Sequence, residues 1–171
     1  MKAFKLIPIL FIVLGNFPYK NLVHAEIKNP QDYKVLSNDS KKLTISNVTY
    51  LIKEGDKYIE NGEFDKAKDY YLDARKLAKQ LASFYSDLNT SFKGIDARIP
   101  SEMQAKGKQT LQILAESNER LASLYIKTGI PEVAVPLLIE TIRIMTPSSK
   151  EGKAAYERLI QLGFVETKFK G

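Results

Sequence analysis

The chain has 171 residues but no cysteine, no tryptophan and a single histidine, His24. Without cysteine it can form neither a disulfide framework nor a lipid-modified cysteine anchor. His24 lies in a segment that we expect to be removed, so the mature chain would lack the side chains on which most general-base catalysis, nucleophile activation and transition-metal binding depend. We therefore expect no enzymatic activity, no catalytic residues, no cofactor and no metal site.

Long hydrophobic runs are also scarce, and the clearest one spans residues 6–14. It follows the basic residues Lys2 and Lys5, and the small-residue pattern Val23-His24-Ala25 comes after it, as is typical of a secretory signal peptide. The run is shorter than the roughly 20 apolar residues of a spanning helix. We predict that residues 1–25 are a signal peptide, with an uncleaved anchor as the alternative, and that the mature chain has no spanning helix.

Charge of one sign does not dominate the chain. Loss of Lys2, Lys5 and Lys20 with the signal peptide would reduce 26 basic residues to 23 against 20 acidic ones, a net charge of +3. The two signs are mixed along the sequence and form no basic stripe of the kind that binds polyanions. We expect no nucleic-acid partner.

The alternating pattern of β-strands is absent after residue 43, and apolar residues recur instead at helical spacing. Residues 26–43 are polar and aperiodic, which predicts an extended or disordered lead-in. The helical spacing in residues 44–163 predicts an all-α domain, and we expect residues 164–171 to be a C-terminal tail. Ser46 or Asn47 is the expected cap of the first helix, and Ser148 with Glu151 forms a capping box before the last. The expected helices are about residues 47–61, 63–92, 101–128, 130–145 and 148–163.

Small and aromatic residues recur at matched offsets in two parts of the chain. The first copy, around YIENGEFDKAKDYYLDA (residues 58–74), contains Gly55, Tyr58, Gly62, Ala67, Tyr71 and Ala74. The second copy begins 67 residues later and contains Ala122, Tyr125, Gly129, Ala134, Leu138 and Thr141. These positions resemble the small, aromatic and turn-glycine positions of the tetratricopeptide repeat (TPR).

Resemblance to this family implies an array of helical hairpins wound into a right-handed α-α superhelix. Paired helices approach closely only where side chains are small. We therefore expect Gly55 and Ala67 to face each other where the first pair crosses, with Tyr58 and Tyr71 filling the wider space on either side.

The middle of the chain departs from the family pattern. A third copy in register would place Asn89, Ser101 and Lys108 at the small positions, which they fit poorly. Two interpretations remain open. Either a degenerate middle repeat is present, or the second and third helices form one long central antiparallel hairpin whose turn is at residues 93–100.

Family members bind proteins through a concave groove lined by the first helix of each pair. The resemblance therefore implies a protein or peptide partner. The side chains expected in the groove are Thr49, Ile52, Lys53, Asp56 and Glu60 from the first copy, with Glu116, Glu119, Arg120, Ser123 and Lys127 from the second. Chaperone-binding members clamp a carboxylate with Lys and Asn, but this chain has Ile52, Asp56, Glu119 and Ser123 at such positions, which argues against an acidic-tail ligand.

The sequence thus predicts a non-enzymatic, exported TPR scaffold that acts in the assembly or stabilisation of a membrane-associated complex. A bacterial periplasm is the expected location, or a thylakoid lumen if the chain resembles exported TPR proteins of cyanobacteria. One alternative is a structural homo-oligomer formed through the long central hairpin. Another is a module that binds cell-wall polymer or sugar, or a carboxylate-dependent hydrolase.

Overall fold

The computed structural model describes residues 43–170, within the second of the two units, Met1–Lys34 and Val35–Gly171, into which the chain divides. The predicted signal peptide and almost all of the predicted lead-in lie outside the described residues. All regular structure in residues 43–170 is helical, which confirms the all-α prediction for this part. The elements are α1 (Ile45–Glu60), α2 (Phe64–Ser91), α3 (Arg98–Lys127), the 3₁₀ turn η1 (Pro131–Val133), α4 (Val135–Met145) and α5 (Lys150–Gln161).

Two helix starts differ from the prediction because another residue supplies the capping oxygen. Thr44, in extended conformation, accepts a hydrogen bond from the Asn47 N–H at 3.1 Å, so α1 begins before Ser46. Ser149, and not Ser148, accepts from the Gly152 N–H at 2.9 Å and caps α5. In each case the side-chain oxygen reaches the backbone N–H three residues ahead, which fixes the first turn.

The start of α3 also differs, because this helix begins at Arg98 and includes Pro100 in its first turn. Proline is tolerated there because the first backbone N–H groups of a helix have no intrahelical acceptor. Of the described helices, none is both long and apolar enough to pass through a membrane.

The turns that follow α1 and α3 have the same geometry, which the end of α5 at Gly163 also adopts. Gly62 and Gly129 have φ of +74° and +81°, a left-handed conformation that glycine adopts without steric cost. After each glycine the chain closes the same hydrogen bond back to a tyrosine carbonyl, from Glu63 N to Tyr58 O at 2.9 Å and from Ile130 N to Tyr125 O at 3.0 Å. The two sequence copies therefore end their first helices alike.

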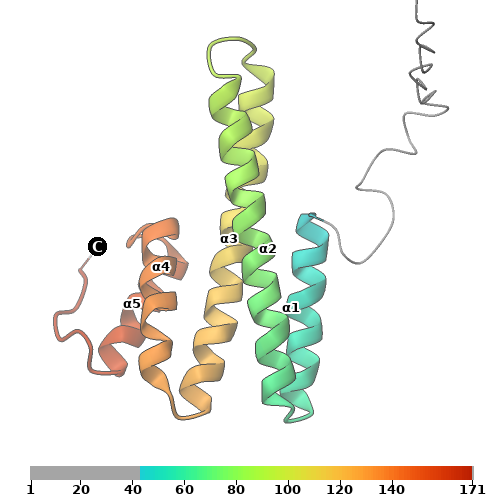
Figure 1. Cartoon of the computed structure of the whole chain (residues 1–171). Helices are drawn as coiled ribbons and strands as arrows, with labels where there is room; N and C mark the ends of the chain where they lie inside the picture. Colours follow the sequence, from blue (N-terminus) through green and yellow to red (C-terminus); the bar gives the residue numbers. More distant parts are fainter. Residues whose placement is uncertain (1–42, 171) are drawn as a thin grey trace, which may run out of the picture. The chain divides into compact units, whose positions relative to one another are not determined.

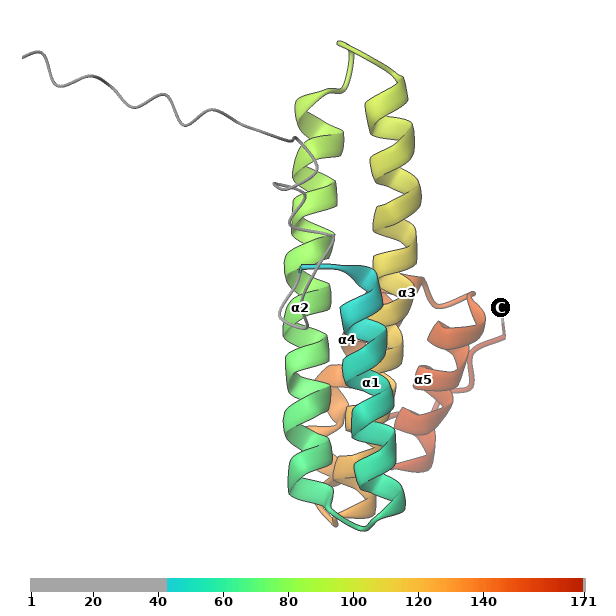
Figure 2. The same cartoon turned by 90° about the vertical axis from the view of Figure 1, so that its right-hand side faces the viewer.

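Within this unit the helices follow one another in chain order across Figure 1, from α1 to α5. The α2–α3 pair is the central contact, α1 packs mainly on α2, and α4 packs on α3 and α5. Figure 2 shows α5 on the side of α3 away from α2. Helices α1 and α5 therefore lie on different sides of α3.

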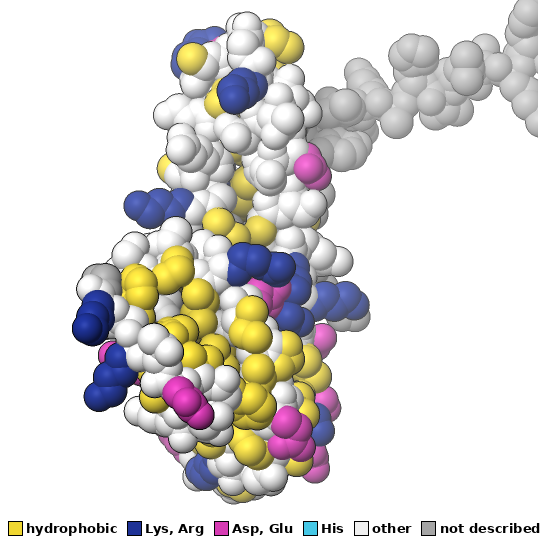
Figure 3. Space-filling model, turned by 90° about the vertical axis from the view of Figure 1, so that its left-hand side faces the viewer, with side chains coloured by type: hydrophobic (Ala, Val, Ile, Leu, Met, Phe, Trp, Pro, Cys, Tyr) yellow, Lys and Arg dark blue, Asp and Glu magenta, His cyan; other side chains and the backbone are white. Residues whose placement is uncertain are grey.

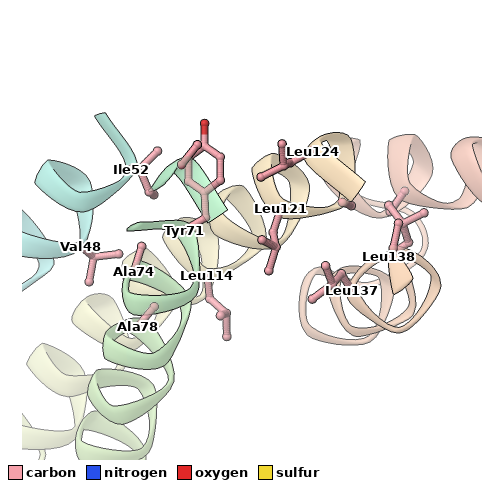
Figure 4. Packing of buried hydrophobic residues seen from close by; sticks show 14 of the residues in the cluster. Val48, Ile52, Tyr71, Ala74, Ala78, Leu114, Leu121, Leu124, Leu137 and Leu138 are labelled. Atoms are coloured by element: carbon pink, nitrogen blue, oxygen red, sulfur yellow. The ribbon is translucent and has the colours of Figure 1, made fainter. Parts of the chain in front are cut away.

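The core takes buried side chains from all five helices, and Figure 4 shows some of them. Tyr71 of α2 lies between Ile52 of α1 and the leucines of α3. A Cβ on Gly55 would lie 2.7 Å from Cδ1 and 3.0 Å from Cζ of Tyr71, and closer still to Cε1. Both Gly55 and Ala67 are buried, and the atoms that a Cβ on Gly55 would meet first belong to Tyr71. The residue that needs Gly55 to lack a side chain is Tyr71, whose ring presses against the α1 backbone.

The other small and large residues of the two copies divide into core and turn positions. Tyr58 and Tyr125 are half-buried, and Tyr58 stacks on Tyr70 with ring centroids 5.2 Å apart. The turn residues Gly62 and Gly129 are exposed. The buried members are Gly55, Ala67, Tyr71, Ala74, Ala122, Ala134, Leu138 and Thr141.

Helices α2 and α3 run unbroken for 28 and 30 residues, and they extend past α1 and α4 (Figure 1). We call residues 82–113 the arm. Within the arm only Met103 and Thr110 are buried, and Ile95 in the turn is 79% exposed. The arm has the form of the predicted long hairpin.

Candidate partner-binding surface

A hollow of about 400 Å³ opens between α1 and the C-terminal half of α3; we call it the α1–α3 hollow. Its floor is apolar and its rim is charged. The floor consists of aromatic and aliphatic side chains from three helices, which the core holds in place. The lining residues are Asp56, Ile59, Glu60, Tyr71, Arg120, Ser123, Leu124 and Lys127.

A second hollow, of about 610 Å³, opens farther along the same helix, between α3 and α5; we call it the α3–α5 hollow. Apolar and amide side chains line it together with carboxylates and one lysine. Thr141 of α4 reaches it from between the two walls. The lining residues are Gln109, Gln112, Ile113, Ala115, Glu116, Glu119, Thr141, Lys150, Glu151 and Ala154.

The wall of the α1–α3 hollow is fixed by Asp56, which joins three helices. Asp56 Oδ1 accepts hydrogen bonds from the Tyr71 hydroxyl at 2.6 Å and from Arg120 Nε at 2.9 Å. Burial of Tyr71, and then its hydrogen bond to Asp56, raise the pKa of the phenol, so Tyr71 is neutral and donates. Arg120 Nη2 also lies 3.6 Å from Glu116, so Arg120 connects the two hollows across the face of α3.

Arg158 of α5 fixes the wall of the α3–α5 hollow by hydrogen bonds to α3. Its Nη1 donates to Glu119 at 2.6 Å and to Ser123 at 2.7 Å, both on α3. The Ser123 hydroxyl in turn donates to Glu119 at 3.3 Å. Arg158 therefore spans from α5 to the same helix face that Asp56 reaches from α1, and it holds the polar side chains of that face in position.

Seven of the ten predicted groove residues line these hollows. Asp56, Glu60, Arg120, Ser123 and Lys127 line the α1–α3 hollow, and Glu116 and Glu119 line the α3–α5 hollow. The repeat offsets thus bring residues that are about 60 positions apart in sequence onto one surface.

The remaining three predicted residues lie elsewhere. Ile52 is 3% exposed and belongs to the core, so its prediction as a groove residue is wrong. It packs inward because it lies one turn from Val48, also buried, on the face of α1 that meets α2. Thr49 is half-buried and donates to the Ile45 carbonyl at 3.2 Å, and Lys53 is exposed outside both hollows.

A polar cluster that the sequence reasoning did not find joins α2, α3 and α4. Glu140 accepts from Arg75 Nη2 at 2.7 Å and from Asn118 Nδ2 at 3.0 Å, and Lys79 Nζ lies 2.6 Å from its other oxygen. Burial acts to raise the pKa of Glu140, but the hydrogen bonds from Lys79, Arg75 and Asn118 outweigh it and hold the pKa below its usual value. The signal in the sequence that could have revealed this cluster is Glu140 itself, a glutamate within the largely apolar stretch VPLLIETIRIM.

Several charged side chains around the hollows are paired with each other. The pairs Asp56–Arg120, Glu116–Arg120 and Glu119–Arg158 fix the direction of these groups. Within residues 43–170 no group of three or more His, Cys, Asp or Glu side chains is placed to hold a metal ion. Apolar floors beside positioned polar rims are typical of surfaces that bind peptide segments.

Comparison of the chain with family models, with curated proteins and with solved structures gives no significant match in any of the three. The functional assignment therefore depends on the geometry of the two hollows.

Proposed function

We propose that this protein is a non-enzymatic, exported TPR-like scaffold that binds a protein or peptide segment along the face of α3, between α1 and α5. The observation that carries the proposal is that both hollows open onto this one helix, with Arg120 and Glu116 between them. A bound segment could follow α3 from one hollow to the other.

The form of the segment follows from the lining. Ile59 and Leu124 in one hollow, with Ile113 and Ala154 in the other, offer apolar contact to alternate side chains of the ligand. Gln109 and Gln112 can donate and accept hydrogen bonds with a peptide backbone. The surface thus provides anchoring pockets and backbone partners for an extended chain, as in other peptide-recognition modes.

The TPR-like superhelix and the exported location belong to the same proposal. The burial of small residues at matched offsets, Gly55 and Ala67 in one copy with Ala122 and Ala134 in the other, supports a repeat array. The basic and apolar start of the sequence supports export. In the periplasm or a thylakoid lumen, such a scaffold would hold a partner during assembly or stabilisation of a membrane-associated complex.

Site-specific photo-cross-linking in the exported compartment tests this proposal. A photoreactive residue at Gln112, on the α3–α5 hollow, and another at Glu60, on the α1–α3 hollow, should capture the same protein. Gln80 is a matched control, because it is an exposed glutamine on α2 that lines neither hollow. Mass spectrometry of the tryptic peptides identifies the captured chain.

Capture from Gln112 and Glu60, with none from Gln80, would support binding across α3. Equal capture from all three positions would indicate non-specific contact. Capture from Gln80 alone would place the partner on α2 and would contradict the proposal.

A further inference from the structure

An outward-facing stripe of side chains runs along η1 and α4 and takes no part in the hollows. Figure 3 shows hydrophobic side chains gathered on the face where α4 and α5 lie. Ile139 is 51% exposed, Pro136 is exposed, and Ile130 and Val133 beside them are each 40% exposed. Clustered apolar exposure of this kind marks an interaction surface more often than isolated exposed residues do.

Each end of this stripe carries one charge. Glu132 and Arg143 are exposed, and neither has an ion-pair or hydrogen-bond partner among residues 43–170. Within α4, at about 100° per residue, positions 136, 139 and 143 lie on one face, and Glu132 lies in the 3₁₀ turn η1 that leads into this helix. Glu132 and Arg143 therefore mark the two ends of the stripe. We call Glu132, Pro136, Ile139 and Arg143 the α4 stripe.

The α4 stripe is complementary to itself when reversed. Glu132 and Arg143 are equally distant from the point midway between Leu137 and Leu138, and so are Pro136 and Ile139. Two copies laid antiparallel would place the Glu132 of each opposite the Arg143 of the other, with Pro136 opposite Ile139 between them. A two-fold interface has this property, because every contact occurs twice.

We propose that the α4 stripe is a homodimer interface in which two copies of this chain pack η1 and α4 antiparallel. The apolar centre supplies the burial, and the two Glu132–Arg143 pairs set the direction and register. A parallel arrangement would place like charges opposite each other at both ends, which disfavours it.

Dimerisation through this stripe leaves both hollows open, because none of its four residues lines them. The dimer would therefore display two copies of the proposed binding surface. Two linked surfaces bind a partner that carries two target segments more tightly than either surface alone.

Sedimentation velocity on the full chain tests the dimer, with residues 1–42 identical in every variant. We expect the wild type to sediment as a dimer of the 19.4 kDa chain. Glu132→Arg and Arg143→Glu each place like charges opposite each other twice, and each should weaken dimerisation at least about tenfold. Circular dichroism and urea unfolding confirm that each variant is folded.

Mixing the two single variants gives the deciding result. In the mixed dimer the two substituted positions face each other with their charges exchanged, and the native Arg143 of one copy faces the native Glu132 of the other. Attraction therefore returns at both ends, and dimers that contain one copy of each variant should form in the mixture. Lys108→Glu, a charge reversal at an exposed lysine of the arm, should leave the wild-type dimer intact.

Several results would overturn the proposal: a wild type that is monomeric at every concentration, single variants that still dimerise, or a mixture that stays monomeric. Loss of the dimer in Lys108→Glu with retention in Glu132→Arg would assign the interface to the arm. Ile139→Asp provides an independent check, because a charge at the apolar centre should also abolish the dimer.

Discussion

Gly55 is the residue at which the packing of the first helix pair is most sensitive to a single methyl group. The buried Tyr71 ring occupies the space of its missing Cβ, and the Tyr71 hydroxyl is held by Asp56. We predict that Gly55→Ala lowers the free energy of unfolding by about 1–3 kcal/mol through overpacking, although alanine is the better helix former. Urea unfolding followed by circular dichroism measures the change.

Gly107 in α3 is the matched control for this substitution. A Cβ there would lie 3.7 Å from Tyr85 Cβ, which is an ordinary contact. Gly107→Ala should therefore raise the free energy of unfolding, by up to about 1 kcal/mol from helix propensity. Equal effects of the two substitutions would show that the Tyr71 ring does not depend on Gly55.

Glu140 makes a contribution to the stability of the fold that depends on pH. Its pKa is lowered in the folded chain from an ordinary value of 4.5, so its contribution is fully present above that value and is lost as the pH falls through the lower, folded-state pKa. We predict that Glu140→Gln costs about 1–3 kcal/mol at neutral pH. The difference from wild type should shrink on acidification below about pH 4.5, as measured by urea unfolding across this range.

Glu102→Gln is the control for Glu140, because Glu102 forms an exposed pair with Lys106 four residues along the arm. Its effect should stay within about 0.5 kcal/mol at every pH. A Glu140→Gln penalty that persists unchanged at low pH would mean that its charge does not stabilise the fold.

The sequence predicted the role of a residue correctly where one chemical property determines which residue type a position accepts. The turn glycines Gly62 and Gly129 were identified because glycine adopts positive φ without strain. The close contact of the Tyr71 ring with Gly55 was not predicted, since spacing shows which residues are small but not which side chain fills the gap. Arg158 was missed because the offsets were applied to two copies, and α5 was not treated as a groove wall.

At the scale of the helices, α2 and α3 each have two parts with different surroundings. Residues 64–81 of α2 and 114–127 of α3 belong to the core with α1 and α4. In the arm, the two helices pack on each other. We predict that backbone amides of residues 82–113 exchange with solvent at lower opening free energy than those of residues 64–81 and 114–127. Native-state hydrogen exchange resolves the two parts, and uniform protection along α2 would contradict this expectation.

Helix positions were predictable from apolar spacing, and the boundaries were less so. The five helices lie where the period placed them, within about three residues at each end when η1 is counted as the start of the fourth. Boundaries depend on which of several neighbouring Ser, Thr or Asn side chains reaches a backbone N–H, and Thr44 and Ser149 compete with equally suitable neighbours. The unbroken length of α2 and α3 followed from the absence of Gly or Pro at a repeat boundary.

For the molecule as a whole, the duplicated pattern predicted a surface and not a ligand. Residues at matched offsets in α1 and α3 meet at the α1–α3 hollow, as Asp56 does with Ser123 and Glu60 with Lys127. The α3–α5 hollow was only partly foreseen, through Glu116 and Glu119.

Calorimetric titration of the cross-linked partner, once purified, against variants of this chain tests partner binding along α3 most directly. Gln112→Trp would place added bulk in the α3–α5 hollow, and Gln80→Trp adds the same bulk to α2 outside both hollows. Binding along α3 predicts at least about a tenfold loss of affinity for Gln112→Trp and no change for Gln80→Trp. Unchanged affinity for Gln112→Trp, with loss for Gln80→Trp, would place the binding site elsewhere.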